Sequence, residues 1–311
     1  LVQENNTVES VRNKVEAYIN IGKSLQSLGD FKLAEKYWKE AIGICKRLDS
    51  QEVYILAICY ASYGEFLNLT GRYIEAKEKF LHAVDFIKNE LLKKVGVDQK
   101  RKYSDIYNSA AINLRDMGEY QNALKYFEKS KELLEDIKVL EEYDQNAIMI
   151  RNVNIAIIMQ DLGEQETSMD TYNQYLQYEK RIGNKREVAH AYELIGNSYI
   201  LEDKYEEANK MFEKSLHMRK KFYVEGQENL LSDEYEVFWC YASKTLLEYR
   251  KYKKIEEIDQ AIVIGNQLCK TYFTAKSIEI LLRLYIQKID YLKGKENQKI
   301  ILEQAIELSE R

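Results

Sequence analysis

Three histidines, at positions 82, 190 and 217, are the side chains of this sequence best suited to acid–base chemistry near neutral pH. His190 stands three residues before Glu193, a spacing that would place both side chains on one helix face as an acid–base pair. The alternative is a solvated ion pair on a polar helix surface. A histidine site needs further partners, and the other histidines lie far away in sequence. We therefore favour the solvated pair and expect no catalytic residue.

The four cysteines, at positions 45, 59, 240 and 269, occur singly along the chain. Zinc sites use closely spaced pairs of ligands, and small secreted domains use a dense cysteine framework. Neither pattern is present, so reduced thiols in the core are expected, with no metal and no cofactor. The sequence also lacks the motifs of a nucleophile elbow or a phosphate-binding glycine loop, which argues against an enzyme.

A code of six positions recurs along the chain and predicts the elements that carry these side chains. The first copy combines small residues at fixed spacing with an aromatic turn residue and a second aromatic. Five copies in register indicate tandem repeats. In order, they are Gly22, Gly29, Phe31, Ala34, Trp38, Ala41; Gly64, Gly71, Tyr73, Ala76, Phe80, Ala83; Ala111, Gly118, Tyr120, Ala123, Phe127, Ser130; Ala156, Gly163, Gln165, Ser168, Tyr172, Tyr175; and Gly196, Asp203, Tyr205, Ala208, Phe212, Ser215.

Each position of the code has a physical reason. The first small residue lets two helices approach closely, and the second glycine closes the first helix in a left-handed conformation. The later small and aromatic residues share one face of a second helix. Each copy is therefore a helical hairpin, which must stack on its neighbours to bury that face. The predicted pairs are 10–28 with 31–48, 52–70 with 73–95, 100–117 with 120–138, 143–162 with 165–182, and 185–202 with 205–222.

The code resembles the tetratricopeptide repeat, which implies an all-α, right-handed superhelical solenoid of antiparallel helix pairs. The third small residues lie 42, 47, 45 and 40 residues apart, against roughly 34 in the standard repeat. Because the chain contains no proline to end them, we expect the second helices of the pairs to be long.

One continuous architecture is expected, in three parts. Residues 1–9 form a polar tail or linker, and residues 10–222 hold five clear repeats. Residues 223–311 hold degenerate repeats and C-terminal capping helices, with 270–292 and 296–311 as a seventh pair. The last helix is predicted to place Ile300, Ile301, Ala305, Ile306 and Leu308 on one side as a cap.

In each pair, the positions of the first helix that face the concave groove are found by counting along that helix from its small residue. Asparagine and glutamine there can hold the backbone of an extended peptide while apolar neighbours form pockets, although solvated amides on an exposed face are the alternative. Asn154 is one residue off the predicted stripe. The predicted peptide-binding residues are Lys23, Gln26, Glu65, Asn68, Asp105, Asn108, Ile112, Arg115, Asn154, Ile157, Gln160, His190, Glu193, Asn197 and Ile200.

Two modes of ligand binding in the repeat family imply different partners. Repeats that clamp a C-terminal carboxylate use lysine where this chain has Ile19 and asparagine where it has Lys23, so a chaperone-tail cochaperone is disfavoured. The long, proline-poor repeats rich in Lys, Ile, Asn and Tyr are similar to those of bacterial peptide-pheromone receptors. In that family asparagines hold the pheromone backbone, and Asn68, Asn108 and Asn197 match such positions.

The second resemblance implies the cytoplasmic sensor region of a bacterial quorum-sensing regulator of transcription, binding a short peptide or an extended protein segment. Its DNA-binding domain would lie outside this sequence. The alternative is a passive scaffold, or the interaction arm of a larger multidomain enzyme or signalling protein.

Charge and hydropathy limit the other partners. The net charge of −5 is spread over interleaved Lys and Glu without a basic stripe, so no nucleic acid is expected to bind through this segment. Apolar runs are far shorter than the roughly 20 residues that span a bilayer, so no membrane contact is expected. The cluster of Tyr235, Phe238, Trp239 and Tyr241 could form a homodimer surface, with packing inside a sixth repeat as the alternative.

Overall fold

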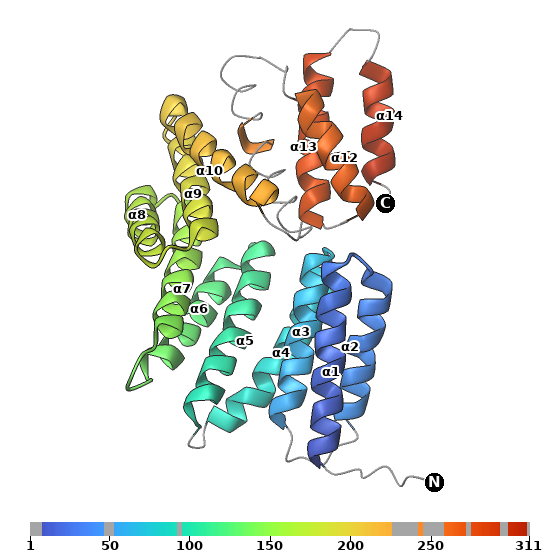
Figure 1. The fold of residues 1–311 in the computed structure, drawn as a ribbon, viewed down its shortest axis with the longest axis vertical. Coiled ribbons are helices and arrows are strands. Elements are labelled where there is room, and N and C mark those ends of the chain that lie inside the picture. The colour runs from blue at the N-terminus through green and yellow to red at the C-terminus, as the bar shows by residue number, and fades with distance from the viewer. Residues whose placement is uncertain are drawn as a thin grey trace. The chain divides into compact units, whose positions relative to one another are not determined.

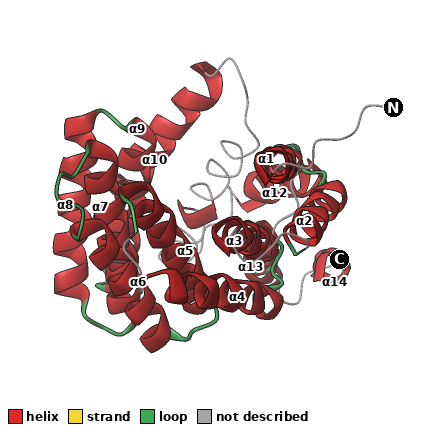
Figure 2. Ribbon diagram, turned by 90° about the horizontal axis from the view of Figure 1, so that it is seen from below, coloured by secondary structure: helices red, strands yellow, loops and turns green. Residues whose placement is uncertain are grey.

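The computed structural model describes residues 8–46, 53–91, 95–225, 242–244, 258–271, 275–292 and 298–309. All regular elements within these residues are helices, joined by short loops where the connecting residues are described (Figure 2). They are α1 (Val8–Ser27), α2 (Phe31–Cys45), α3 (Val53–Leu69), α4 (Tyr73–Leu91), α5 (Val97–Asp116), α6 (Tyr120–Glu135), α7 (Glu142–Asp161), α8 (Gln165–Ile182), α9 (Lys185–Leu201), α10 (Tyr205–Glu225), α12 (Ile258–Thr271), α13 (Ala275–Tyr291) and α14 (Gln298–Ser309).

The chain forms two compact units, residues 1–161 and 162–311. In unit 1 the pairs α1–α2, α3–α4 and α5–α6 follow one another along the ribbon, and α7 comes last (Figure 1). Each second helix contacts the first helix of the next pair, and the first helices α1, α3, α5 and α7 contact each other in order. This stacking is that of an all-α solenoid of antiparallel helix pairs, and the predicted fold class is confirmed.

Glycines close the first helices as the sequence predicts. Gly29, Gly71, Gly118 and Gly163 have φ angles of 80°, 78°, 76° and 94°. These values lie in the left-handed region, which a residue without a β-carbon adopts at little cost. In the fifth repeat Asp203 takes the same place with φ 56°. The chain therefore reverses in the same way after each of these helices.

In the first two repeats the small residue inside the first helix faces the aromatic ring of its pair. A β-carbon built on Gly22 would lie 2.9 Å from Cε2 of Trp38, and one on Gly64 would lie 3.0 Å from Cε1 of Phe80. Trp38 also packs on Phe66, with ring centroids 4.6 Å apart, and both rings are fully buried. Close approach of the helices thus requires glycine at these positions.

The second helices of the pairs differ in length. α4, α8 and α10 have 19, 18 and 21 residues and are long, as predicted, whereas α2 and α6 have only 15 and 16. The first helices α5 and α7, with 20 residues each, also contribute to the long repeat period.

In unit 2, α9 packs on both α8 and α10, and α13 packs on both α12 and α14. The buried side of α14 carries Ile301, Ala305 and Leu308, as predicted, but Ile300 and Ile306 are 54% and 47% exposed. The expected capping face is wrong for these two residues, because the helix turns them away from α13. The aromatic cluster at 235–241 and most of the tail at 1–9 lie outside the described residues, and α1 already begins at Val8.

Two of the predicted core thiols are buried side by side. Sγ of Cys45 and Sγ of Cys59 lie 3.5 Å apart. Among the helices described, none has both the length and the apolar character needed to cross a lipid bilayer.

Candidate functional site

Polar side chains join the first helices α3 and α5 of unit 1. Nδ2 of Asn68 donates to Oδ2 of Asp116 at 3.2 Å, and Oδ1 of Asn68 accepts from Nδ2 of Asn113 at 2.8 Å. Nδ2 of Asn113 also donates to the carbonyl oxygen of Tyr73 at 3.1 Å, and the Asn113 side chain is fully buried. Both ends of the Asn68 amide are therefore held.

The same pattern continues from α5 to α7. Nη1 of Arg115 donates to Oδ1 of Asn154 at 2.9 Å, while its Nη2 donates to Oδ1 of Asp116 at 3.0 Å. Nδ2 of Asn154 then lies 3.4 Å from Oδ1 of Asn108, at the long limit of a hydrogen bond. We call this set of six residues the polar ladder: Asn68, Asn108, Asn113, Arg115, Asp116 and Asn154.

Asn108 has an amide donor that the ladder does not use. It is half-buried, and no described residue accepts a hydrogen bond from its Nδ2. Ile112 follows it by one helical turn on α5, and Ile157 follows Asn154 by nearly one turn on α7. Both isoleucines are half-buried. An amide donor flanked by apolar side chains can hold a carbonyl oxygen and leave an apolar contact beside it.

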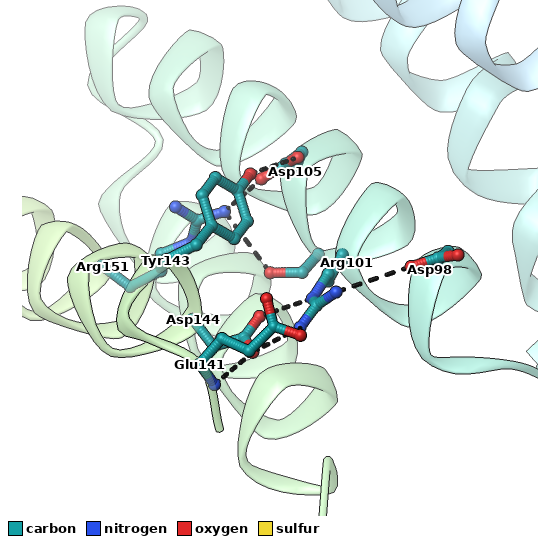
Figure 3. A network of polar contacts seen from close by, with 8 residues as sticks. Asp98, Arg101, Asp105, Glu141, Tyr143, Asp144 and Arg151 are labelled. Carbon is teal, nitrogen blue, oxygen red and sulfur yellow. Dashed lines mark hydrogen bonds and ion pairs between the residues drawn. The ribbon is translucent and has the colours of Figure 1, made fainter. Parts of the chain in front are cut away.

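A second network links the N-terminal halves of α5 and α7 (Figure 3). Arg101 makes two hydrogen bonds of 2.8 Å to the fully buried carboxylate of Asp144, and these bonds hold the pKa of Asp144 below its ordinary value. Nη2 of Arg151 donates to Oδ1 of Asp105 at 2.7 Å, and the hydroxyl of Tyr143 donates to Oδ2 of Asp105 at 3.3 Å. The two helices are thus fixed to each other at both ends of the face that holds Asn108.

The structure brings four of the predicted residues into the ladder, namely Asn68, Asn108, Arg115 and Asn154, and places Asp105 in the second network. Glu65 is exposed on α3 and accepts a 2.7 Å hydrogen bond from Oγ of Ser109. On α1, Lys23 is exposed and Gln26 half-buried, while Gln160 near the end of α7 is 9% exposed.

Sequence reasoning missed several partners in these networks. Asn113 follows the packing residue Ala111 by two positions, where polarity inside a buried stripe could have been noticed. Asp116 stands in the last turn of α5 beside Arg115. The feature that could have identified Arg151 and Asp144 was a charged residue type at a position that the fold buries.

The predicted residues of unit 2 lie on α9, and one of them is not on an open surface. The Glu193 side chain is 2% exposed, and its Oε1 accepts hydrogen bonds of 2.7 Å from Nε of Arg219 and from Oγ of Ser215. The expected solvated pair of His190 with Glu193 is wrong, because Nδ1 of His190 lies 3.5 Å from Oε2 of Glu187 instead. Asn197 and Ile200 are half-buried on the same helix.

Next to this pair lies a buried carboxyl group without a hydrogen-bond partner. Glu179 on α8 is fully buried, and neither of its carboxyl oxygens has a partner among the described residues. Burial, and then the negative charge of Glu187, raise the pKa of Glu179 to about 7. The bond from His190 holds the pKa of Glu187 at about 2. The neighbouring carboxyl groups therefore differ in protonation near neutral pH.

Comparison with known proteins gives the class of fold. The model of the tetratricopeptide repeat matches residues 15–47, 104–135 and 189–222, which lie in the pairs α1–α2, α5–α6 and α9–α10. No curated protein matches the chain. Among solved structures, NprR in complex with its cognate peptide NprX is 15% identical, with a TM-score of 0.70 over 97% of this chain and 79% of that one.

Two further structures are similar in fold. A Rap protein complexed with competence and sporulation factor is 12% identical, with a TM-score of 0.53 over 96% of this chain and 98% of that one. Aspartyl phosphate phosphatase F from Bacillus subtilis is 10% identical, with a TM-score of 0.53 over 98% of this chain and 95% of that one. At such identities the likeness shows the fold alone.

Proposed function

We propose that this chain, which has the fold of the tetratricopeptide-repeat proteins, binds a short peptide or an extended protein segment on the face formed by α3, α5 and α7. The observation that carries the proposal is the amide of Asn108, whose Nδ2 has no acceptor among the described residues. An extended peptide has a free backbone carbonyl at every residue, so it supplies the missing acceptor.

The polar ladder makes this amide a better ligand group than a solvated asparagine. Arg115 fixes the oxygen of Asn154, and this leaves the amide nitrogen of Asn154 directed toward Asn108. Binding then costs less side-chain entropy, because the orientation of the amides is set before the ligand arrives. Ile112 and Ile157 would contact apolar side chains of the ligand.

The wider role that we propose is that of a non-catalytic sensor in the bacterial cytoplasm that responds to a peptide and regulates transcription through a DNA-binding partner domain. The complex of NprR with its cognate peptide, at a TM-score of 0.70, supports a peptide as ligand for this fold. Within the described residues, no group of three or more His, Cys, Asp and Glu side chains is arranged to hold a metal ion.

Isothermal titration calorimetry of the full chain tests the proposal, with synthetic apolar peptides encoded by short reading frames beside its own gene as probes. A peptide that binds should bind about tenfold more weakly to Asn108→Ala, the loss of roughly one to two hydrogen bonds. Asn122→Ala is the matched control, because Asn122 is an exposed asparagine on α6. Equal affinity of both variants would reject the site, and capture of large proteins without any peptide binding would favour a scaffold.

A further inference from the structure

Two cysteine side chains meet at the junction between the first and second helix pairs of unit 1. Sγ of Cys45, the last residue of α2, lies 3.5 Å from Sγ of Cys59 in α3. The two residues are 4% and 0% exposed. They stand fourteen positions apart in sequence, so it is the fold that brings their sulfur atoms into contact.

The next junction, between α4 and α5, carries isoleucine at both equivalent positions of the repeat code. Ile87 follows its code alanine by eleven residues, as Cys45 does, and Ile106 precedes its small code residue by five, as Cys59 does. The two isoleucines are 0% and 4% exposed and belong to the same apolar core as the two cysteines. Aliphatic side chains thus meet the packing requirement at these positions, so packing alone does not explain a pair of thiols.

A pair of thiols held in contact can form a disulfide. The bond requires an S–S distance of about 2.05 Å, which is roughly 1.5 Å less than the separation in the reduced chain. Cys45 is the last helical residue of α2, and the end of a helix has fewer backbone hydrogen bonds to hold it than the interior. The required movement can therefore take place in the last turn of α2, while α3 stays in position.

We propose that Cys45 and Cys59 are a redox-active pair, which forms a reversible disulfide when the chain meets a peroxide and so links the first helix pair covalently to α3. In a reducing compartment such a bond persists only while the oxidant is present. The site is separate from the proposed peptide-binding face, because both thiols are buried in the core and neither belongs to the polar ladder.

The surroundings of the two thiols assign the order in which they react. The hydrogen bond with Cys45, and then burial, raise the pKa of the Cys59 thiol above its ordinary value, so this thiol stays protonated and is a poor first nucleophile. Cys45 is slightly exposed at the end of a helix. It therefore meets the oxidant first, when the last turn of α2 opens locally.

Atoms and electrons balance over two steps. In the first, the sulfur of Cys45 attacks one oxygen of hydrogen peroxide, the O–O bond breaks, and the thiol proton leaves with the released hydroxide as water, which gives a sulfenic acid. In the second, the sulfur of Cys59 attacks that of Cys45, the S–O bond breaks, and the second thiol proton leaves with hydroxide as water. Each sulfur loses one electron, and the peroxide is reduced to water. Glutathione reverses the bond by thiol–disulfide exchange.

Mass spectrometry of the full chain after treatment with hydrogen peroxide tests the proposal. Peptide mapping should find a link between Cys45 and Cys59, with two hydrogen atoms fewer than in the reduced peptides. Cys240→Ser/Cys269→Ser is the matched control, because it keeps only the proposed pair, and it should form the link to the same extent. Cys59→Ala should instead stop at a sulfenic acid on Cys45, which dimedone labels.

Equilibration in glutathione buffers measures whether the fold favours the bond. In the variant that keeps only the proposed pair, the equilibrium constant for disulfide formation should be at least about tenfold larger in the folded chain than in urea, because the fold holds the sulfur atoms in contact. This comparison keeps both buried thiols, so it stands whether or not Cys59→Ala folds. An equal or smaller constant in the folded chain would overturn the proposal. A link that joins other cysteines, or sulfinic acid on Cys45 without any link, would do the same.

Discussion

Nη1 of Arg115 lies 2.9 Å from Oδ1 of Asn154, and this hydrogen bond joins α5 to α7 across the proposed peptide-binding face. Asn154 is 8% exposed, so water has poor access to its amide oxygen and would not replace the hydrogen bond from Arg115 if the guanidinium were removed. The bond is therefore both a structural link between two repeats and the device that orients the amide nitrogen of Asn154.

Arg115→Ala should lower the free energy of unfolding by about 1–3 kcal/mol, because it leaves Asn154 and Asp116 without their charged partner. Urea denaturation of the purified chain measures the change. The control is Arg283→Ala, since Arg283 pairs with Glu279 at an exposed site and such pairs contribute about 1 kcal/mol at most. Equal losses in the two variants would show that the ladder adds no stability.

Gly22→Ala should destabilise the chain by about 1–3 kcal/mol, since the new β-carbon would stand 2.9 Å from the ring of Trp38 in a packed core. Gly43→Ala on α2 meets no atom within 4 Å and should instead stabilise by about 0.5–1 kcal/mol, as alanine is the better helix former. Differential scanning calorimetry should give shifts of opposite sign. Two shifts of the same sign would contradict the assigned packing role.

The glycine code shows what could be predicted from the sequence. Gly22 and Gly29 lie seven residues apart, and the structure uses the first for close approach to Trp38 and the second for a positive φ angle. Both requirements are local, so residue type and spacing were sufficient. The positions of the helices followed from these turns.

Partner choice across helices could not be predicted in the same way. His190 has a glutamate three residues before it and another three residues after it, and spacing alone favours neither Glu187 nor Glu193. The partner of Glu193 is Arg219, which lies one turn after the core residue Ser215 and binds Glu193 in the interior. Glu187 is therefore the glutamate that pairs with His190. The feature of the sequence that could have indicated this pair is an arginine at a core position of α10, because a buried guanidinium needs a carboxylate as its partner.

Glu193→Ala should cost about 3–5 kcal/mol of unfolding free energy, because Arg219 would be left charged and buried. The double variant Glu193→Leu/Arg219→Leu should be less destabilised than the single one, since no buried charge remains. Glu279→Ala, at an exposed ion pair, is the control with little expected effect. Chemical denaturation measures the free energy of unfolding of the three variants. A double variant less stable than Glu193→Ala would refute the argument.

Glu179 should make the chain less stable as the pH rises from about 4.5 to about 7. Its pKa is near 7 in the folded chain and near 4.5 when unfolded, so the folded state holds the proton longer. The loss is at most roughly 1.4 kcal/mol per pH unit from this group. The low pKa of Glu187 acts in a separate window, giving stability that is lost only below about pH 4.5.

Glu179→Gln keeps the shape of the side chain and removes its ionisation. Thermal melts between pH 5 and pH 8 should therefore show a flatter dependence than the wild type, with the largest gain in stability above pH 7. Parallel curves for the two proteins would mean that Glu179 carries no raised pKa.

The most direct test of the account is the location of a bound peptide by photo-cross-linking. An apolar peptide found by calorimetry, synthesised with a diazirine side chain, would be irradiated with the full chain and the labelled residues identified by mass spectrometry. We predict labels on the first helices of unit 1, within 53–69, 97–116 and 142–161, and weaker labelling of Asn108→Ala at peptide concentrations near the wild-type dissociation constant. Labels confined to the second helices, within 31–45, 73–91 and 120–135, would contradict the proposed binding face.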